Sequence, residues 1–182
     1  NGVDTDYFSV DDTRSSPFPP GELPVVFTGA MDYLPNVDAA TWFASDVLPG
    51  LLQRWPAVRF YVVGRNPSAA VLALASDRIV VTGTVDDVRP YLQHAATVVA
   101  PLRIARGIQN KILEAMAMGR PVIASATCAA AVDAVAGQEL LTATSPEEYI
   151  AAISQVLEAP ETATAMGGAA RQRVVERYTW EA

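Results

Sequence analysis

Short apolar runs that alternate with helical segments constrain this chain more than any other feature of its sequence. Five firm runs recur: PVVFTG (24–29), VRFYVVG (58–64), RIVVTG (78–83), ATVVAPL (96–102) and PVIAS (121–125). A weaker sixth run is QELLTA (138–143). Because the runs are apolar throughout rather than alternating, they predict parallel strands that helices cover on both faces. The pattern therefore predicts an α/β fold, a Rossmann-like doubly wound sheet of about six strands.

The ends of the predicted strands indicate where a ligand would bind. In doubly wound sheets, ligands bind at the carboxyl ends of the strands, near the point where the strand order reverses. Three predicted strands end in glycine, at Gly29, Gly64 and Gly83, and the fourth continues through Pro101 into a basic loop. We expect a binding site at this edge, with Gly29 among its backbone.

The remaining segments carry helical patterns. They are NVDAATWFASDVLPGLLQRW (36–55), PSAAVLALAS (67–76), DDVRPYLQHA (86–95), GIQNKILEAMAMG (107–119), SPEEYIAAISQVLEAP (145–160) and ETATAMGGAARQRVVERY (161–178). Ser145 is a predicted N-cap that forms a capping box with Glu148. We expect Pro90 to interrupt its helix, and Gly167 and Gly168 to break or kink the last one.

The chain begins with a segment of different composition. Its first 23 residues, NGVDTDYFSVDDTRSSPFPPGEL, are polar and rich in Pro, Ser and Asp. Such a composition is typical of an extended leader or linker. We therefore divide the 182 residues into a linker at 1–23 and one folded domain at 24–182.

The composition excludes several classes of protein. With 51% hydrophobic and 18% charged residues, the chain can form a large core, which argues against global disorder. No apolar run approaches the roughly 20 residues of a membrane-spanning helix. A formal net charge of −7 argues against nucleic acid as the partner. The single cysteine, Cys128, excludes an internal disulfide and favours a reducing cytoplasm. One cysteine and one histidine, His94, cannot form a Cys/His zinc site. We expect both residues to have packing roles.

One cluster of positive charge contrasts with the acidic chain. Arg103, Arg106 and Lys111 lie where a helix is predicted to begin, with no acid before Glu114. A helix N-terminus carries about +0.5 charge, so these cations are unfavourable there unless an anion lies among them. Together with the free N–H groups near Gly107, they form a candidate phosphate site. Two alternatives stay open, namely solvated surface cations and a surface ion pair between Lys111 and Glu114.

Several blocks of the sequence resemble a known enzyme family. The most specific block is LEAMAMGRPVIAS (113–125). The blocks NGVDTDYF (1–8), PVVFTGAMDYLPNVDAA (24–40), FYVVGRNP (60–67) and IVVTGTVDDVRPYLQHA (79–95) occur in the expected order and spacing. Over essentially its whole length the chain resembles retaining GT-B glycosyltransferases of the glycosyl transferases group 1 family, and most closely the branch associated with exopolysaccharide gene clusters. The resemblance implies the C-terminal, nucleotide-sugar-binding domain of a two-domain enzyme, with the donor held between two Rossmann-like domains.

This resemblance assigns roles to residues of the basic loop and the helix after it. Glu114 matches the family glutamate that accepts hydrogen bonds from the ribose hydroxyls, a role that suits an ionised carboxylate. Gly107 and Ile108 match the backbone that approaches the diphosphate. Arg103 and Lys111 match cations that stabilise the departing diphosphate, which would make them the catalytic residues.

The same resemblance covers the other strand ends, with two departures. The segment from Val81 to Val85 matches the one that contacts the base. Arg106 stands where the family often has a glutamate that reads the donor sugar, so we hypothesise that it binds a phosphate oxygen or a sugar carboxylate. Asn36 stands near the place of a phosphate-binding lysine and can donate only a neutral hydrogen bond. Arg65, after the second strand, could supply the missing charge or be a surface residue.

The resemblance implies a reaction and its partners. A sugar would move from a nucleoside-diphosphate sugar, with retention, to a glycan or lipid-linked acceptor, without metal or other cofactor. The acceptor would be placed by an N-terminal domain outside this chain, so the fragment is expected to bind nucleotide with little or no transfer. A cytoplasmic location is expected, and the resemblance allows peripheral association of the full-length protein with the inner face of the membrane. Two alternatives stay open: a non-catalytic nucleotide-binding module and a GT-B sugar-nucleotide epimerase.

Overall fold

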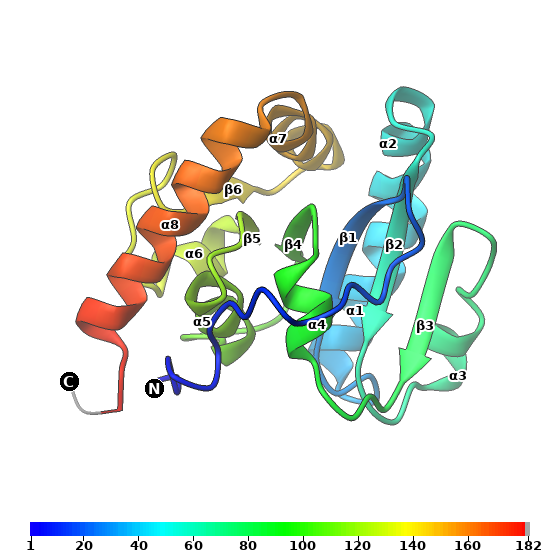
Figure 1. Cartoon of the computed structure of the whole chain (residues 1–182). Coiled ribbons are helices and arrows are strands. Elements are labelled where there is room, and N and C mark those ends of the chain that lie inside the picture. Colours follow the sequence, from blue (N-terminus) through cyan, green and yellow to red (C-terminus); the bar gives the residue numbers. More distant parts are fainter. Residues whose placement is uncertain (181–182) are drawn as a thin grey trace.

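A sheet of six parallel strands forms the centre of the protein in the computed structural model, which describes residues 1–180 (Figure 1). The strands are β1 (Leu23–Thr28), β2 (Val58–Val63), β3 (Ile79–Gly83), β4 (Thr97–Ala100), β5 (Val122–Ser125) and β6 (Leu141–Ala143). Their spatial order is β3-β2-β1-β4-β5-β6, so the direction in which strands are added reverses between β1 and β4. This order confirms the predicted doubly wound fold, and each predicted run contributes one strand.

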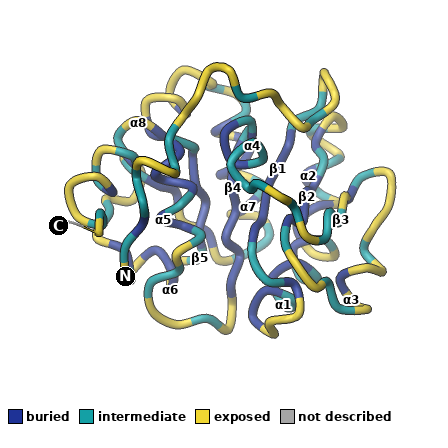
Figure 2. Tube along the Cα trace, turned by 60° about the horizontal axis from the view of Figure 1, so that its bottom comes forward, coloured by how far each residue is buried: buried dark blue, intermediate teal, exposed yellow. Residues whose placement is uncertain are grey.

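Helices cover both faces of the sheet. They are α1 (Leu34–Trp42), a π-helical turn η1 (Phe43–Val47), α2 (Leu48–Arg54), α3 (Ala69–Leu72), α4 (Arg89–Gln93), α5 (Asn110–Ala117), α6 (Ala126–Ala130), α7 (Pro146–Glu158) and α8 (Pro160–Arg177). The α1–η1–α2 segment packs with α7, whereas α5 packs with α8. Buried residues follow the strands between these layers, and exposed residues lie on the outer loops and helix faces (Figure 2).

Proline explains two differences between the expected and observed helices. The segment predicted as one helix at 36–55 contains a π-helical turn just before Pro49, where the N–H of Leu48 bonds to the carbonyl of Phe43. This hydrogen bond spans five residues instead of the four of an α-helix. The wider turn fits a following proline, which has no N–H to donate to the preceding turn. The expectation that Pro90 interrupts its helix is wrong, because α4 begins at Arg89 and Pro90 lies in its first turn, where no N–H is needed.

Glycine explains a third difference. The last helix, α8, runs without a break from Pro160 to Arg177, so the kink expected at Gly167 and Gly168 is absent. Gly167 instead faces the chain after α5, because a Cβ at this position would lie only 2.0 Å from the carbonyl oxygen of Gly119. Gly119 itself, with φ of +69°, ends α5 as predicted.

Other helix ends agree with the sequence, with one shift. The capping box of α7 is present, with the Ser145 hydroxyl accepting from the Glu148 N–H and the Glu148 carboxylate accepting from the Ser145 N–H. Helix α5 begins at Asn110 rather than at Gly107, so Arg106 and Gly107 lie in the preceding loop. Lys111 is in its first turn, which contains no acid, as the sequence indicated.

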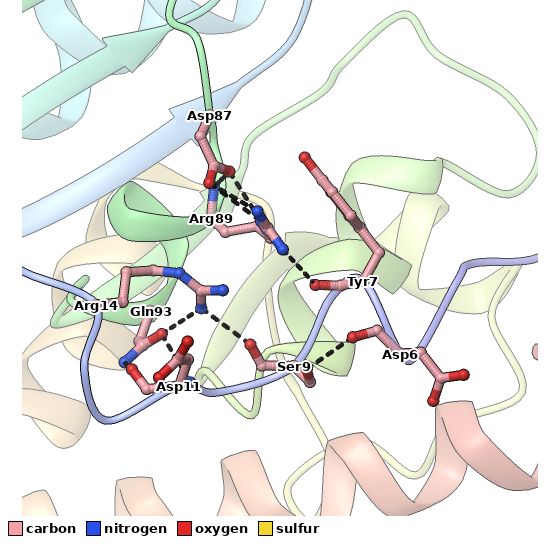
Figure 3. Close-up of polar contacts among 8 residues, drawn as sticks. All are labelled: Asp6, Tyr7, Ser9, Asp11, Arg14, Asp87, Arg89 and Gln93. Carbon is pink, nitrogen blue, oxygen red and sulfur yellow. Dashed lines mark hydrogen bonds and ion pairs between the residues drawn. The ribbon is translucent and has the colours of Figure 1, made fainter.

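The N-terminal segment has little regular structure, yet it is held against the domain. The Arg14 guanidinium donates to the Ser9 carbonyl at 2.9 Å and to the Gln93 side chain, and Gln93 donates back to the Asp11 carbonyl at 2.8 Å (Figure 3). Arg89 of α4 lies 3.9 Å from the centroid of the Tyr7 ring. The first strand begins at Leu23, one residue before the predicted start of the domain.

Candidate functional site

A cleft of about 640 Å³ opens at the carboxyl ends of β1, β2 and β3, beside the start of α5. It is lined by Thr28, Gly29, Ala30, Tyr33, Asn36, Val63, Gly64, Arg65, Thr84, Val85, Val88, Gln109, Asn110, Lys111 and Glu114. The cleft therefore lies at the edge where the sequence placed a ligand, next to the reversal of strand order between β1 and β4.

Two glycines shape the floor of this cleft. A Cβ on Gly64 would lie 1.6 Å from the carbonyl oxygen of Gly29, so the loops after β2 and β1 pack backbone against backbone. A Cβ on Gly29 would lie 2.6 Å from Asn36 Nδ2 and 2.7 Å from Lys111 Nζ. Glycine at these strand ends thus leaves room for the side chains that enter from α1 and α5.

Lys111 brings positive charge to the cleft without a carboxylate partner. Its ammonium donates to Asn36 Oδ1 at 2.5 Å and lies 4.6 Å from the centroid of the buried Phe27 ring. Among residues 1–180, no carboxylate lies within ion-pair distance of it. Burial lowers the pKa of Lys111 to about 8, although the nearby charge of Glu114 acts in the opposite direction. A half-buried ammonium whose charge no carboxylate in the described part of the chain neutralises would attract an anion into the cleft.

Glu114 lies one turn further along α5 and also lines the cleft. Burial raises the pKa of its carboxyl, and the charge of Lys111 partly offsets this effect. The two side chains are not within ion-pair distance, so the surface ion pair considered as an alternative does not form. Both groups therefore remain available to a ligand in the cleft.

The two arginines of the basic loop have other surroundings. Arg103 forms a two-pronged ion pair with Asp38 of α1, with Nε–Oδ2 and Nη2–Oδ1 distances of 3.0 and 2.6 Å. Its guanidinium also lies 5.3 Å from the centroid of the Trp42 ring. Arg106 is exposed on the loop before α5. The structure thus resolves the charge conflict at Arg103 with an acid of this chain, and leaves Arg106 in solvent.

Other predicted residues divide between the cleft and its surroundings. Gly29, Asn36, Arg65, Val85, Lys111 and Glu114 line the cleft, whereas Val81, Arg103, Arg106, Gly107 and Ile108 do not. Gly107 adopts a φ of +75°, in the left-handed region that favours glycine, and the Ile108 carbonyl accepts from Asn1 Nδ2 at 3.1 Å. The predicted diphosphate role of this loop stays a prediction.

Sequence reasoning missed several lining residues. Thr28 and Val63 end β1 and β2, and Gly64 directly follows Val63, so the rule that placed Gly29 in the site could also have found them. Thr84 and Val88 flank the predicted Val85. Tyr33, whose side chain is largely exposed in the loop before α1, gave no signal in the sequence.

The histidine and the cysteine take no part in the cleft. His94 caps the end of α4, and its Nε2 is 2.8 Å from the carbonyl oxygen of Arg14, while Cys128 is buried in the core. Within residues 1–180, no three His, Cys, Asp or Glu side chains converge closely enough to hold a metal ion. No helix of that part of the chain combines the length and hydropathy needed to cross a bilayer.

Comparisons with known proteins define the class to which this fold and cleft belong. The family described as Glycosyl transferases group 1 matches residues 22–159, and the chain is a member of that family. The architecture is that of the C-terminal domain of GT-B glycosyltransferases. A search of curated protein sequences finds no significant match.

Solved structures similar to this chain share its fold at low identity. Anabaena HepE in complex with UDP superimposes with a TM-score of 0.81 at 17% identity, covering 98% of this chain and 52% of HepE. Sucrose-phosphate synthase from Thermosynechococcus elongatus superimposes with a TM-score of 0.80 at 21% identity, covering 99% of this chain and 48% of the synthase. A third match is the C-terminal domain of LpcC, a glycosyl transferase group 1 family protein from Francisella tularensis. It superimposes with a TM-score of 0.76 at 16% identity, covering 98% of this chain and 100% of the LpcC domain. The chain thus spans about half the length of HepE and of the synthase.

Proposed function

We propose that this chain is the donor-binding domain of a retaining glycosyltransferase that uses a nucleoside-diphosphate sugar. The observation that carries the proposal is the ammonium of Lys111, which lies at a glycine-lined strand end and has no carboxylate partner among the residues that the structure describes. A diphosphate would supply the missing negative charge. Membership of the family and the crystallisation of HepE with UDP support the same class of ligand.

The residues of the cleft suit the three parts of the donor's nucleotide, namely the diphosphate, the ribose and the base. Lys111 would contact the diphosphate, with Gly29 allowing close approach of the backbone. Glu114 would accept hydrogen bonds from the two ribose hydroxyls, because an ionised carboxylate has two acceptor oxygens. Thr84 and Val85 would face the base from the end of β3.

In the proposed reaction the bond between the anomeric carbon and the diphosphate oxygen breaks, and a bond to an acceptor hydroxyl oxygen forms on the same face of the sugar. The proton of the acceptor hydroxyl passes to the oxygen of the departing diphosphate. Lys111 lowers the barrier by stabilising the charge that develops on the departing diphosphate, so no metal is needed for this role. Arg103 would join Lys111 only by leaving Asp38, whereas Arg106 is exposed and could reach a phosphate or a sugar carboxylate.

The acceptor and the biological setting belong to the proposal as well. We propose a glycan or lipid-linked acceptor, placed by a second domain, in exopolysaccharide biosynthesis at the cytoplasmic side of the membrane. The support is the resemblance of the sequence blocks described above. On this proposal the domain alone binds the nucleotide and transfers little or no sugar.

Calorimetric titration with UDP, GDP, ADP and CMP tests the donor site. We expect one nucleoside diphosphate to bind, and we expect Lys111→Ala and Glu114→Ala each to weaken it about 10- to 100-fold. That range corresponds to the roughly 1.5–3 kcal/mol of a hydrogen bond to a charged group. Arg177→Ala and Glu161→Ala, at exposed positions of α8, are the matched controls.

Different results identify different failures. If no nucleotide binds to this domain or to the full-length protein, the donor-site proposal is wrong. If the full-length protein binds a nucleotide sugar but releases no nucleoside diphosphate with any glycan acceptor, the domain is a non-catalytic binding module. If it interconverts sugar epimers without transfer, the epimerase alternative holds.

A further inference from the structure

Asn36 is the only side chain that holds the Lys111 ammonium by a hydrogen bond in the described part of the chain. It enters from the first turn of α1, only 5% exposed, and its Nδ2 donates to the Ala30 carbonyl at 2.9 Å. Because an ammonium can only donate and a carbonyl can only accept, both contacts require the same orientation of the amide. The amide is thus fixed by the loop after β1 and directs its oxygen at Lys111.

The chemical type of this partner matters. An aspartate has nearly the same shape as asparagine and would also accept from Lys111, but it would neutralise the ammonium and stabilise its charged form. An amide oxygen gives a hydrogen bond without a charge. Asn36 therefore fixes the position of the cation and leaves its charge uncompensated.

Other groups near Lys111 do not fill the role of a counter-ion. Glu114 on the same helix and Cys128 of α6 act on Lys111 only at longer range. Tyr33 and Arg65 line the same cleft from the loops after β1 and β2, and Arg65 adds a second positive charge. The bond to Asn36 and the ring of Phe27 are thus the close contacts that place the ammonium at this strand end.

We propose that Asn36 is a positioning residue that holds the Lys111 ammonium at the carboxyl end of β1 without neutralising it, so that the charge is available to the donor diphosphate. This inference rests on the proposed donor site. It changes the role expected for Asn36, since its amide acts on Lys111 rather than on the phosphate.

The test uses the fact that Lys111 is the only lysine in the sequence. Lysine labelled with ¹³C at Cε therefore gives one side-chain signal, whose pH titration reports on Lys111 directly. The variants are Asn36→Asp and Asn36→Ala. Asn110→Asp is the matched control, because it adds the same charge to the cleft at a residue that does not bond to Lys111.

Each variant is titrated with UDP and with uridine between pH 7 and pH 8.5, below the pH at which the uracil N–H ionises, or with the guanosine or adenosine pair if the wild type selects that base. Uridine lacks the phosphates, so its affinity shows whether the variant still forms the base and ribose site. In the wild type, UDP affinity should fall as the pH rises through about 8, because Lys111 then loses its proton. Uridine affinity should not follow this curve.

The proposal predicts a distinct result for each variant. Asn36→Asp should raise the pKa of Lys111 above its wild-type value, because the new carboxylate stabilises the charged ammonium. It should weaken UDP binding at pH 7 about tenfold or more and leave uridine binding unchanged. Asn36→Ala should weaken UDP about three- to tenfold without raising that pKa, because the ammonium is no longer held. Asn110→Asp should weaken UDP less than Asn36→Asp does and leave the lysine signal nearly unchanged.

The proposal is overturned if Asn36→Asp and Asn36→Ala bind UDP as the wild type does and the lysine signal titrates at the wild-type pH. It is also overturned if Asn110→Asp reproduces the whole effect of Asn36→Asp. Failure of the wild type to bind any nucleotide would instead refute the proposed function, and the lysine titration would still decide whether Asn36 holds Lys111.

Discussion

At the scale of single residues, Lys111 is charged in surroundings that disfavour its charge. Within residues 1–180, its ammonium has one neutral hydrogen-bond partner and one aromatic ring within reach, and burial lowers its pKa to about 8. Such a group lowers the stability of the empty domain, and the cost is offset when an anion binds. Binding and stability should therefore respond in opposite directions when Lys111 is replaced.

The variant Lys111→Met tests this opposition. Methionine has a similar length and no charge, so we expect the free energy of unfolding at pH 7 to rise by about 1–2 kcal/mol, while nucleotide binding is lost. The pKa of Lys111 is lower in the folded state than the ordinary 10.5, so the unfolded chain binds this proton more tightly. The rise in the free energy of unfolding should therefore be largest below pH 8 and become smaller as the pH increases towards 10.5. Urea denaturation at several pH values measures it, and a loss of stability at pH 7 would contradict the argument.

The sequence allowed some of these residues to be predicted and not others. Lys111 could be found because a first turn without acids and with a lysine is unusual in an acidic chain. Glu114 could be found through the family resemblance of the block LEAMAMGRPVIAS. The surroundings of Arg103 could not, because its partner Asp38 is distant in the sequence and the pairing exists only in the fold. The bond between Asn36 and Lys111 is likewise a contact between α1 and α5 that no local pattern encodes.

At the scale of elements, the close approach of α8 to the end of α5 depends on one glycine. The backbone of Gly167 meets the carbonyl of Gly119, and no Cβ fits between them. The neighbouring Gly168 is exposed, and a Cβ there would meet no atom within 4 Å. The two adjacent glycines thus have opposite environments in the same helix.

Alanine at the two positions should therefore have opposite effects. We expect Gly167→Ala to destabilise the domain by about 2–3 kcal/mol, because α8 must move away from α5. Gly168→Ala should stabilise it by about 0.5–1 kcal/mol, since alanine is the better helix former at an exposed interior position. Thermal denaturation of both variants decides the matter. Equal effects of the two changes would show that helix propensity, rather than packing, dominates here.

The elements themselves were largely predictable. Apolar runs bounded by glycine and proline identified all six strands, because burial on both faces leaves a strong signal in the sequence. Irregularities inside the helices could not be predicted as well. The glycine pair suggested a kink because local propensity cannot show a neighbouring carbonyl, and Pro49 did not reveal that a π-helical turn would accommodate it.

At the scale of the whole molecule, the N-terminal segment is part of the folded body rather than a free linker. The N–H of Val3 bonds to the Tyr178 carbonyl at 2.8 Å, which ties the start of the segment to the end of α8. Arg89, which holds Tyr7, directly follows Val88 of the cleft wall. Polar composition suggested an extended leader, and it could not show that side chains of α4 and α8 would bind that leader's backbone.

Arg171 of α8 is the residue whose removal should release this segment. Its guanidinium donates to the carbonyls of Phe8 at 2.9 Å, Thr5 at 3.2 Å and Ala117 at 2.6 Å, so one side chain joins the leader to the end of α5. Charge-assisted hydrogen bonds of this kind are stronger than neutral ones. In Arg171→Ala we expect amide hydrogen exchange at residues 3–9 to accelerate about tenfold or more, with the strands unchanged.

The control is Arg177→Ala, which removes an exposed arginine of the same helix that pairs with Asp133 at 3.5 Å. Faster exchange in both variants would mean that the end of α8 simply loosens when charge is lost. Faster exchange confined to Arg171→Ala would show that the leader is attached through this guanidinium. The segment would then move with the sheet as one body, and the contact of Arg89 with Tyr7 would connect its position to the wall of the cleft. An unchanged exchange rate in Arg171→Ala would assign that attachment to the contacts that Gln93 and Arg89 of α4 make with the segment instead.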